Sequence, residues 1–222
     1  STYIIILISF LAGYFEYVFL TLLIITIHEM GHYFMSYALN MKVKEIRIMF
    51  FGGITILDED LNLLIKKEIL MILMGPISQI LFYLLVFYLY KIGYVNNAVF
   101  EKFSLINKIL LSFNLLPILP LDGGKLLNNI LDLILPFNLS HIVSIIVSII
   151  SLPLLFLIDN KLLIIVTLLF LIFKIINEIK EHKYRLNKLL LERKINNYNF
   201  KKTIIIDDIK YVMRNKNHIL KT

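Results

Sequence analysis

The sequence contains no cysteine, and this absence limits the chemistry open to the chain. Disulfide bonds and thiolate ligands are excluded, so a zinc site would have to use histidine, aspartate or glutamate. Charged residues are also scarce, at 18% of the chain, whereas 59% of residues are hydrophobic and the mean hydropathy is +0.80. A soluble globular domain is roughly 45–50% apolar. The composition therefore predicts a polytopic membrane protein.

Apolar runs long enough to cross a bilayer recur along the chain. The first run has no basic n-region and no small-residue cleavage site, so it does not resemble a signal peptide. We expect an all-α polytopic membrane protein whose residues 1–178 form a transmembrane domain. About six transmembrane helices are expected, at roughly 1–15, 17–41, 68–92, 103–121, 139–158 and 161–178.

A short membrane-associated β-hairpin is expected between the second and third spans. Residues 47–57 form two short β segments around a turn at Gly52 and Gly53. These glycines are candidate substrate-binding residues, because a strand pair can offer its edge to an extended peptide; an ordinary interfacial hairpin is the alternative. The surrounding loop is rich in Lys and Arg, so we expect the loop to lie in the cytoplasm. With six spans, both termini would then lie in the cytoplasm as well.

Residues 179–222 are expected to form a basic cytoplasmic tail. The formal net charge is +7, and 13 of the 23 Lys and Arg residues lie between Lys174 and Lys221. This charge favours contact with the anionic lipid of the bilayer. Because the tail has no nucleic-acid recognition motif, we expect no direct nucleic-acid binding. Within it, residues 203–206 predict a strand and Asp207 predicts the cap of a short helix.

The second apolar run contains the pattern HExxH, formed by His28, Glu29 and His32. Residues i and i+4 share one face of a helix, so the two histidines can bind one metal ion. Glu29 is placed to take a proton from a metal-bound water. Ionisable groups inside a span are costly, and packing alone does not require this spacing. A catalytic zinc site is therefore favoured over groups that merely satisfy a neighbouring helix.

A catalytic zinc ion usually has three protein ligands. The pattern HExxHxxGxxH is excluded, because Met35 and Ala38 stand where its glycine and third histidine would be. His141 is expected to be a packing residue, alone on an apolar helix. Asp122 follows a proline-broken run and is the favoured third ligand; a cap of the following helix is its alternative role.

The broken run from Asn114 to Gly124 implies a cavity at membrane depth. Pro117 and Pro120 interrupt the helix, and irregular backbone within a membrane is tolerated only where it is buried or lines a wet cavity. The side-chain amide of Asn114 could bind substrate backbone or stabilise an oxyanion, or could form an interhelical hydrogen bond. In the third span, the pair Gly75-Pro76 predicts a structural role, a kink and close helix packing.

Two motifs together resemble those of a known family. HExxH at residues 28–32 and NxxPxPxxDG at residues 114–123 are similar to the two motifs of the site-2 protease family of intramembrane zinc metalloproteases, peptidase family M50. The resemblance implies that His28, His32 and Asp122 bind one Zn²⁺ and that Glu29 is the catalytic acid and base. It also implies cleavage of a peptide bond in or near a membrane segment of a substrate protein.

Within that family, the residues around Gly52-Gly53, the run that ends at Lys125 and residues 190–193 resemble a branch that acts in bacterial sporulation. This likeness implies a membrane-associated substrate, the inactive precursor of sigma factor K, and inhibitory partner membrane proteins. It also implies a multi-pass location in a bacterial membrane, specifically the outer forespore membrane, and a tail that begins a nucleotide-sensing CBS domain.

Two other functions stay open on the sequence. One is a different class of membrane HExxH metalloprotease with a glutamate as third ligand, for which Glu178 is the candidate. The other is a metal transporter, which should show repeated halves and a second cluster of ligands within the membrane. The sequence shows neither of these two features.

Overall fold

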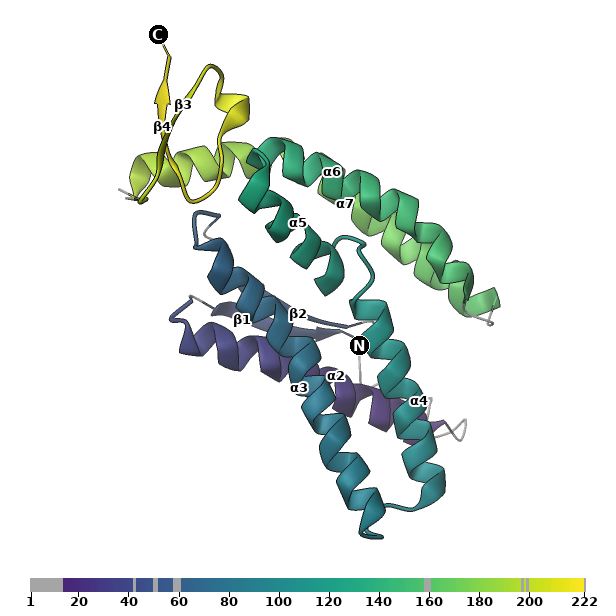
Figure 1. Cartoon of the computed structure of the whole chain (residues 1–222). Helices are drawn as coiled ribbons and strands as arrows, with labels where there is room; N and C mark the ends of the chain where they lie inside the picture. Colours follow the sequence, from purple (N-terminus) through teal and green to yellow (C-terminus); the bar gives the residue numbers. More distant parts are fainter. Residues whose placement is uncertain are drawn as a thin grey trace. The chain divides into compact units, whose positions relative to one another are not determined.

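The computed structural model describes residues 14–41, 43–49, 52–57, 61–157, 161–196, 198 and 200–221. Its chain divides into two compact units, which are described separately (Figure 1). The first comprises Ser1–Glu59 and Leu70–Asn114, and the second comprises Asp60–Ile69 and Leu115–Thr222. Most of the first predicted span falls on residues 1–13, outside the described residues.

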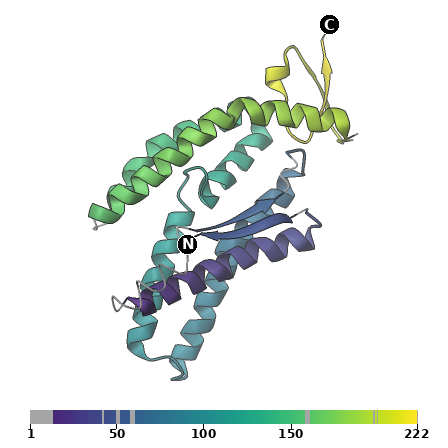
Figure 2. The ribbon, with the colours of Figure 1, turned by 180° about the vertical axis from the view of Figure 1, so that it is seen from behind.

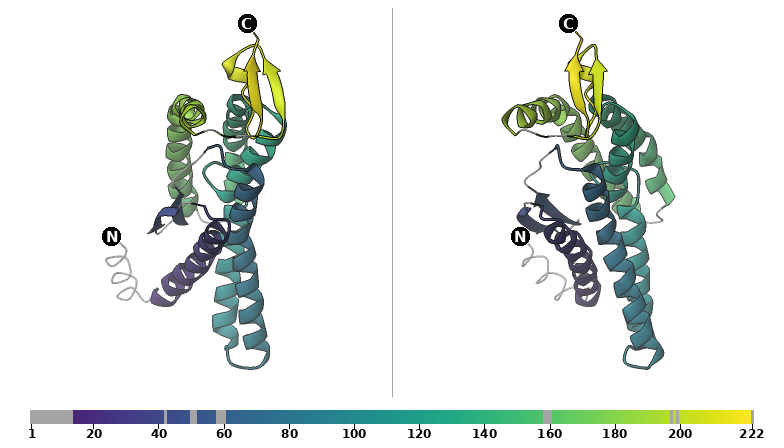
Figure 3. Two further views of the ribbon diagram at one scale, coloured as in Figure 1. Left: turned by 90° about the vertical axis from the view of Figure 1, so that its left-hand side faces the viewer. Right: turned by 60° about the vertical axis from the view of Figure 1, so that its left-hand side comes forward.

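The first unit is built on three helices, α2 (Phe15–Ala38), α3 (Ile65–Lys91, from Leu70 onward) and α4 (Asn97–Asn114). α3 and α4 form an antiparallel pair joined by a short loop, and α2 packs against α4 (Figure 3). Their contact contains the buried side chains of Leu20, Ile24 and Phe103. Many other apolar side chains point outward, as expected for helices that face lipid.

The predicted hairpin is confirmed as an antiparallel pair, β1 (Val43–Met49) and β2 (Gly52–Leu57), that lies beside α2 (Figure 2). Gly52 pairs with Met49 and Gly53 pairs with Ile48. The two glycines therefore begin β2, and the prediction that they form the turn is wrong. A residue without a side chain is tolerated at the start of a strand that pairs immediately after the chain reverses.

Three described helical segments are long and apolar enough to cross a membrane: Phe15–Ala38, Ile65–Lys91 and Phe137–Leu155. The total of six spans stays a prediction. The apolar run expected as the fourth span is divided, because α4 ends at Asn114 and α5 begins only at Asp122. The expected boundary between membrane domain and tail, at residue 178, falls inside a single long helix, α7, and also stays a prediction.

The second unit pairs helices with a small parallel sheet. α6 and α7 run side by side with α5 next to α6, and the sheet lies near the carboxyl end of α7 (Figures 1 and 2). A cluster of buried apolar side chains, which includes Leu61, Leu189 and Ile206, holds the sheet against the helices. The elements are α5 (Asp122–Ile134), α6 (Phe137–Ser151), η1 (Leu152–Leu157), α7 (Lys161–Ile195), β3 (Thr203–Ile206), η2 (Ile209–Tyr211) and β4 (Asn217–Leu220).

The tail confirms one local prediction and corrects another. β3 coincides with the predicted strand and pairs in parallel with β4, which the sequence analysis did not predict. The cap of the short helix is Asp208 and not Asp207, because the side chain of Asp208 accepts a hydrogen bond from the main-chain nitrogen of Lys210 at 3.2 Å. Two adjacent aspartates offer the same capping chemistry, and only the backbone path decides between them.

A buried arginine ties this tail to the helices of its unit. Arg214 is 4% exposed; its guanidinium donates to the Glu68 carboxylate and lies 3.2 Å from the Asp132 carboxylate. Burial raises the pKa of Asp132, and Arg214 opposes this effect. Burial acts to lower the pKa of Arg214, but the two carboxylates outweigh it and raise that pKa. One cation thus compensates one fully buried acid, Asp132, and one partly buried acid, Glu68.

Candidate metal centre

The HExxH residues lie on one buried face of α2. His28, Glu29 and His32 are 4%, 7% and 5% exposed, and the ligand atoms of the three side chains all lie within 4.8 Å of one another. A spacing of four residues is slightly more than one helical turn, which brings both imidazoles to the same side. Within the described part of the chain, no other trio of His, Asp and Glu side chains is grouped this closely.

Contacts to α3 determine which nitrogen of each imidazole carries the proton. Nδ1 of His28 lies 3.0 Å from the side-chain oxygen of Gln79, and Nδ1 of His32 lies 2.9 Å from the main-chain oxygen of Met71. Carbonyl oxygens only accept hydrogen bonds, so each Nδ1 must be the donor. In the neutral ring the lone pair is then on Nε2, which is the nitrogen that can bind a metal.

The arrangement of the two Nε2 atoms fits a zinc ion. They face each other at 3.2 Å, and with both Nδ1 atoms protonated neither of them has a proton to share. Two lone pairs that meet in this way are stabilised by a cation. Two nitrogen ligands at 2.0–2.1 Å from a tetrahedral zinc ion would lie about 3.3 Å apart. The donor atoms and their spacing are therefore those that zinc requires.

Gly75 on α3 provides the space next to this pair. A Cβ at position 75 would lie 2.8 Å from Nε2 of His28, and closer still to Cε1 and Nε2 of His32. The missing side chain thus leaves room where a metal ion would bind. The sequence predicts a kink and close packing at Gly75, and the structure shows that the close contact is with both imidazoles.

The third predicted ligand, Asp122, is the first residue of α5, in the second unit. Leu121 occupies the cap position of this helix, so the cap is not Asp122. Its assignment as a zinc ligand stays a prediction. The same holds for the predicted substrate-binding roles of Gly52 and Gly53 in β2 and of Asn114, the last residue of α4.

The proline-containing segment before α5 packs tightly against that helix. A Cβ on Gly123 would overlap the main chain of Leu115, and a Cβ on Gly124 would overlap the main chain of Ile118. Both glycines are therefore explained by the close approach of this segment to the first turn of α5. Pro117 and Pro120 lie in the segment, half-buried, and their role in substrate binding stays a prediction.

The residues that support the histidines were not identified from the sequence. Met71, Gly75 and Gln79 are spaced four apart and therefore share one face of α3. A glutamine in an otherwise apolar span carries a cost, and this was the available signal. The sequence alone does not show which helix its amide contacts.

His141 is 1% exposed and hydrogen-bonded, in agreement with the expected packing role. Its Nδ1 lies 2.8 Å from Nδ1 of His182 on α7, and its Nε2 lies 3.2 Å from the Glu178 carboxylate. Arg185 donates to the same carboxylate at 2.8 Å. Burial lowers the pKa of His182, with further lowering by His141 and Arg185. Glu178, the alternative third ligand, is therefore already engaged with a cation and an imidazole in its own unit.

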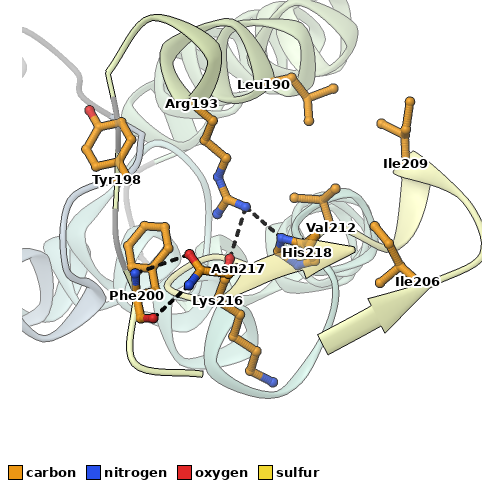
Figure 4. A pocket seen from close by; sticks show the side chains of 10 residues that line it. All are labelled: Leu190, Arg193, Tyr198, Phe200, Ile206, Ile209, Val212, Lys216, Asn217 and His218. Atoms are coloured by element: carbon orange, nitrogen blue, oxygen red, sulfur yellow. Dashed lines mark hydrogen bonds between the residues drawn. The ribbon is translucent and has the colours of Figure 1, made fainter. Parts of the chain in front are cut away.

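A pocket of about 440 Å³ lies in the tail, lined by residues from α7, η2, both strands and the segments that connect them (Figure 4). Arg193 borders it; its guanidinium donates to the oxygens of Asn62, Met213 and Lys216 and lies 2.8 Å from Nδ1 of His218. These contacts hold the chain around β4 to the end of α7. The guanidinium thus serves the fold of the tail, and nothing in its contacts requires a ligand.

Both ring nitrogens of His218 face N–H groups of the tail. Nδ1 lies 2.8 Å from Arg193, and Nε2 accepts from the main-chain nitrogen of Met213 at 2.9 Å. The neutral ring carries its one proton on Nδ1, and a second proton on Nε2 would face the main-chain N–H of Met213. Burial, Arg193 and Lys216 together lower the pKa of His218 to about 4.

Comparison with known proteins agrees with the geometry of the α2 site. Residues 16–104 match Peptidase family M50. Stage IV sporulation protein FB of Bacillus subtilis is 34% identical over 131 residues, which are 59% of this chain and 46% of that protein. The zinc metalloprotease MJ0392 of Methanocaldococcus jannaschii is 27% identical over 111 residues, 49% of this chain and 32% of the relative. The chain thus spans less than half the length of the curated relatives that it matches.

A third relative and a solved structure extend this agreement. The putative zinc metalloprotease sll0528 of Synechocystis is 33% identical over 105 residues, 46% of this chain and 28% of that protein. The structure of the site-2 protease from M. jannaschii superposes with a TM-score of 0.62 at 20% identity, covering 80% of this chain and 87% of the other. The chain therefore shares the fold of that site-2 protease, and its residues 16–104 match peptidase family M50.

Proposed function

We propose that this protein is an intramembrane zinc metalloprotease that hydrolyses a peptide bond in or near a membrane segment of a substrate protein. One observation carries the proposal: two buried Nε2 atoms face each other beside Glu29 on a helix long and apolar enough to cross a membrane. The family match over this helix and the names of two zinc metalloprotease relatives support it.

His28 and His32 would hold the zinc ion through Nε2, and we propose Asp122 as the third ligand. Bound zinc supplies a Lewis acid that polarises the scissile carbonyl and makes a water molecule more acidic. Glu29 takes the proton of the attacking water and later delivers it to the leaving amine. The burial of this face of α2 keeps bulk water away, so that each charge acts in a medium of low polarity.

The substrate would lie in an extended conformation near the hairpin. Within the described residues β1 and β2 pair only with each other, so an outer strand edge is available to an added strand. We propose that Gly52 and Gly53 allow the substrate backbone to approach and that the amide of Asn114 binds it. Pro117 and Pro120 keep the neighbouring segment irregular, which would give water access to the site.

The finer proposal concerns the biological role. The relative named stage IV sporulation protein FB supports a function in sporulation. We propose the precursor of sigma factor K as substrate, inhibitory membrane partner proteins as regulators, and a multi-pass location in a bacterial membrane, the outer forespore membrane, with both termini in the cytoplasm. The CBS character of the tail belongs to the same proposal.

The two alternatives are less well supported. Glu178 is engaged by Arg185 and His141, which makes it a poor third ligand for the α2 histidines. A transporter should contain a second group of metal ligands, and among the described residues only the α2 group is found.

The test is cleavage of a candidate single-span substrate co-expressed with wild type, Glu29→Gln or Glu16→Gln. Glu29→Gln keeps size and polarity but removes the base, so cleavage should fall by roughly 10²–10⁴-fold while zinc content is retained. Glu16→Gln is the matched control, because Glu16 is on the same helix and pairs with Lys102 far from the histidines. Equal cleavage by all three proteins would refute the protease mechanism.

The third ligand has its own test. Asp122→Ala should lower the zinc content of the purified chain, whereas His141→Ala should leave it unchanged, because His141 bonds to Glu178 and His182 instead. Full zinc content and full cleavage in Asp122→Ala would show that Asp122 is not a ligand.

A further inference from the structure

Gln79 is a buried polar side chain within an apolar helix and contacts a proposed zinc ligand. It is 0% exposed, and its side-chain oxygen lies 3.0 Å from Nδ1 of His28. Its side-chain nitrogen donates to the main-chain oxygen of Asn107 at 3.0 Å and to the side-chain oxygen of the same residue at 3.2 Å. Three helices, α2, α3 and α4, therefore meet at this one amide.

Asn107 determines which way the amide of Gln79 points. Both Asn107 atoms that meet Gln79 are oxygens, and Asn107 is itself only 5% exposed. If the amide were rotated by 180°, its oxygen would face two oxygens in a place that water does not reach, and a buried polar group without a partner costs free energy. The side-chain oxygen of Gln79 is therefore held toward His28.

This orientation in turn determines the tautomer of His28. An oxygen at Nδ1 requires a proton on Nδ1, which leaves the lone pair on Nε2 opposite the Nε2 of His32. We propose that Gln79, oriented by Asn107, is a positioning residue of the metal centre that holds His28 in its metal-binding tautomer and orientation. The proposal rests on the proposed function, because it assumes that the histidine pair binds zinc.

The two histidines are supported by different kinds of partner. His32 donates to a main-chain oxygen, that of Met71, which no substitution can remove. His28 depends on a side chain, so its support can be tested by mutation. Partners of this kind contribute roughly 10–100-fold to metal affinity in characterised sites.

The test compares two variants of this chain with wild type, all purified in detergent. The quantity measured is the dissociation constant for zinc, in competition with a chelator. Gln79→Met keeps the volume of the side chain but offers His28 no oxygen, so zinc affinity should fall by about 10–100-fold. Gln79→Glu keeps an oxygen acceptor beside His28, and the O–H of its neutral form can donate to Asn107 as the amide nitrogen does, so its zinc affinity should exceed that of Gln79→Met. A role in packing alone predicts the reverse order, because Met suits an apolar helix and Glu does not.

A control and a second variant keep the result interpretable. Ser78→Ala removes a hydrogen bond from α3 to the main chain of Ile27 on α2 without contacting a histidine, so zinc affinity should not change. Asn107→Ala removes one of the two oxygens that hold the amide of Gln79, the side-chain oxygen, and keeps the main-chain oxygen, so a partial loss of affinity is expected even if Gln79→Met folds poorly.

The outcomes separate this inference from the function on which it rests. If wild type binds no zinc, the proposed function fails. If wild type binds zinc and His28→Ala loses it, but Gln79→Met and Asn107→Ala match wild type, only the positioning role is overturned. It is also overturned if Gln79→Glu binds zinc more weakly than Gln79→Met.

Discussion

A single added methyl group should disable the metal centre. In Gly75→Ala the new Cβ would lie 2.8 Å from Nε2 of His28 and nearer to the ring of His32. Non-bonded carbon and nitrogen atoms approach to about 3.5 Å, so the rings would have to move by roughly 0.7 Å or more. Zinc–ligand distances tolerate deviations of only about 0.2 Å.

The expected effect is loss of zinc without loss of the helix. We expect zinc affinity to fall by at least about 100-fold, equivalent to about 2.8 kcal/mol. A change from glycine to alanine within a helix by itself favours the helix by about 1 kcal/mol. Reduced zinc binding therefore cannot be attributed to a weaker α3.

The assay measures metal content by mass spectrometry and helix content by circular dichroism on the purified protein. Leu84→Ala is the control, because Leu84 is on the same helix and is 53% exposed. We expect it to retain zinc. If Gly75→Ala retains wild-type zinc content and wild-type cleavage, the placement of Gly75 against the histidines is wrong.

Three further predictions concern the tail and the topology. Arg214→Met should destabilise the fold of the tail by about 3–5 kcal/mol, because it leaves the buried carboxylate of Asp132 and the partly buried one of Glu68 without their cation. The loss should appear as lower resistance to limited proteolysis, and unchanged resistance would contradict it. The pKa of His218 is about 4 in the fold and about 6.5 unfolded, so the unfolded tail binds the proton first. Tail stability should be constant above about pH 6.5 and fall as the pH drops toward 4. This pH dependence should be weaker in His218→Gln. An identical pH profile of stability for the two proteins would contradict the role of His218. Because the chain has no native cysteine, a cysteine at Asn97 should react with an impermeant thiol reagent in intact cells and one at Asn187 should not, and the opposite labelling would invert the topology.

The local chemistry of the site could be predicted from the sequence, but its supporting contacts could not. His28 and His32 share a face because of helix geometry alone, which depends only on residue spacing. The roles of Gly75 and Gln79 depend on how α3 packs against α2 and α4, and a single sequence holds little information about such contacts. The pattern of apolar residues predicted that these were spans, but not which side chains would meet between them.

The tail shows the same division between local and long-range features. A run of three isoleucines after Thr203 predicted β3. The partner strand β4 has a polar residue and a histidine at its start and was not predicted, because it forms only by pairing with β3 across an intervening loop. The apolar run that ends in Asp122 was expected as one interrupted span. The structure divides this run into the end of α4, a connecting segment and the start of α5. The two prolines of the connecting segment prevent the helix from continuing, and the two glycines lie in the first turn of α5.

The central claim is that the buried histidine pair on α2 binds zinc, and X-ray absorption at the zinc edge of the purified protein tests it most directly. The account predicts about one zinc ion per chain, with two imidazole nitrogens at about 2.0–2.1 Å and oxygen in the remaining positions. His28→Ala should lose this signal. A wild-type protein without zinc, or zinc whose nearest neighbours include no imidazole, would contradict the account.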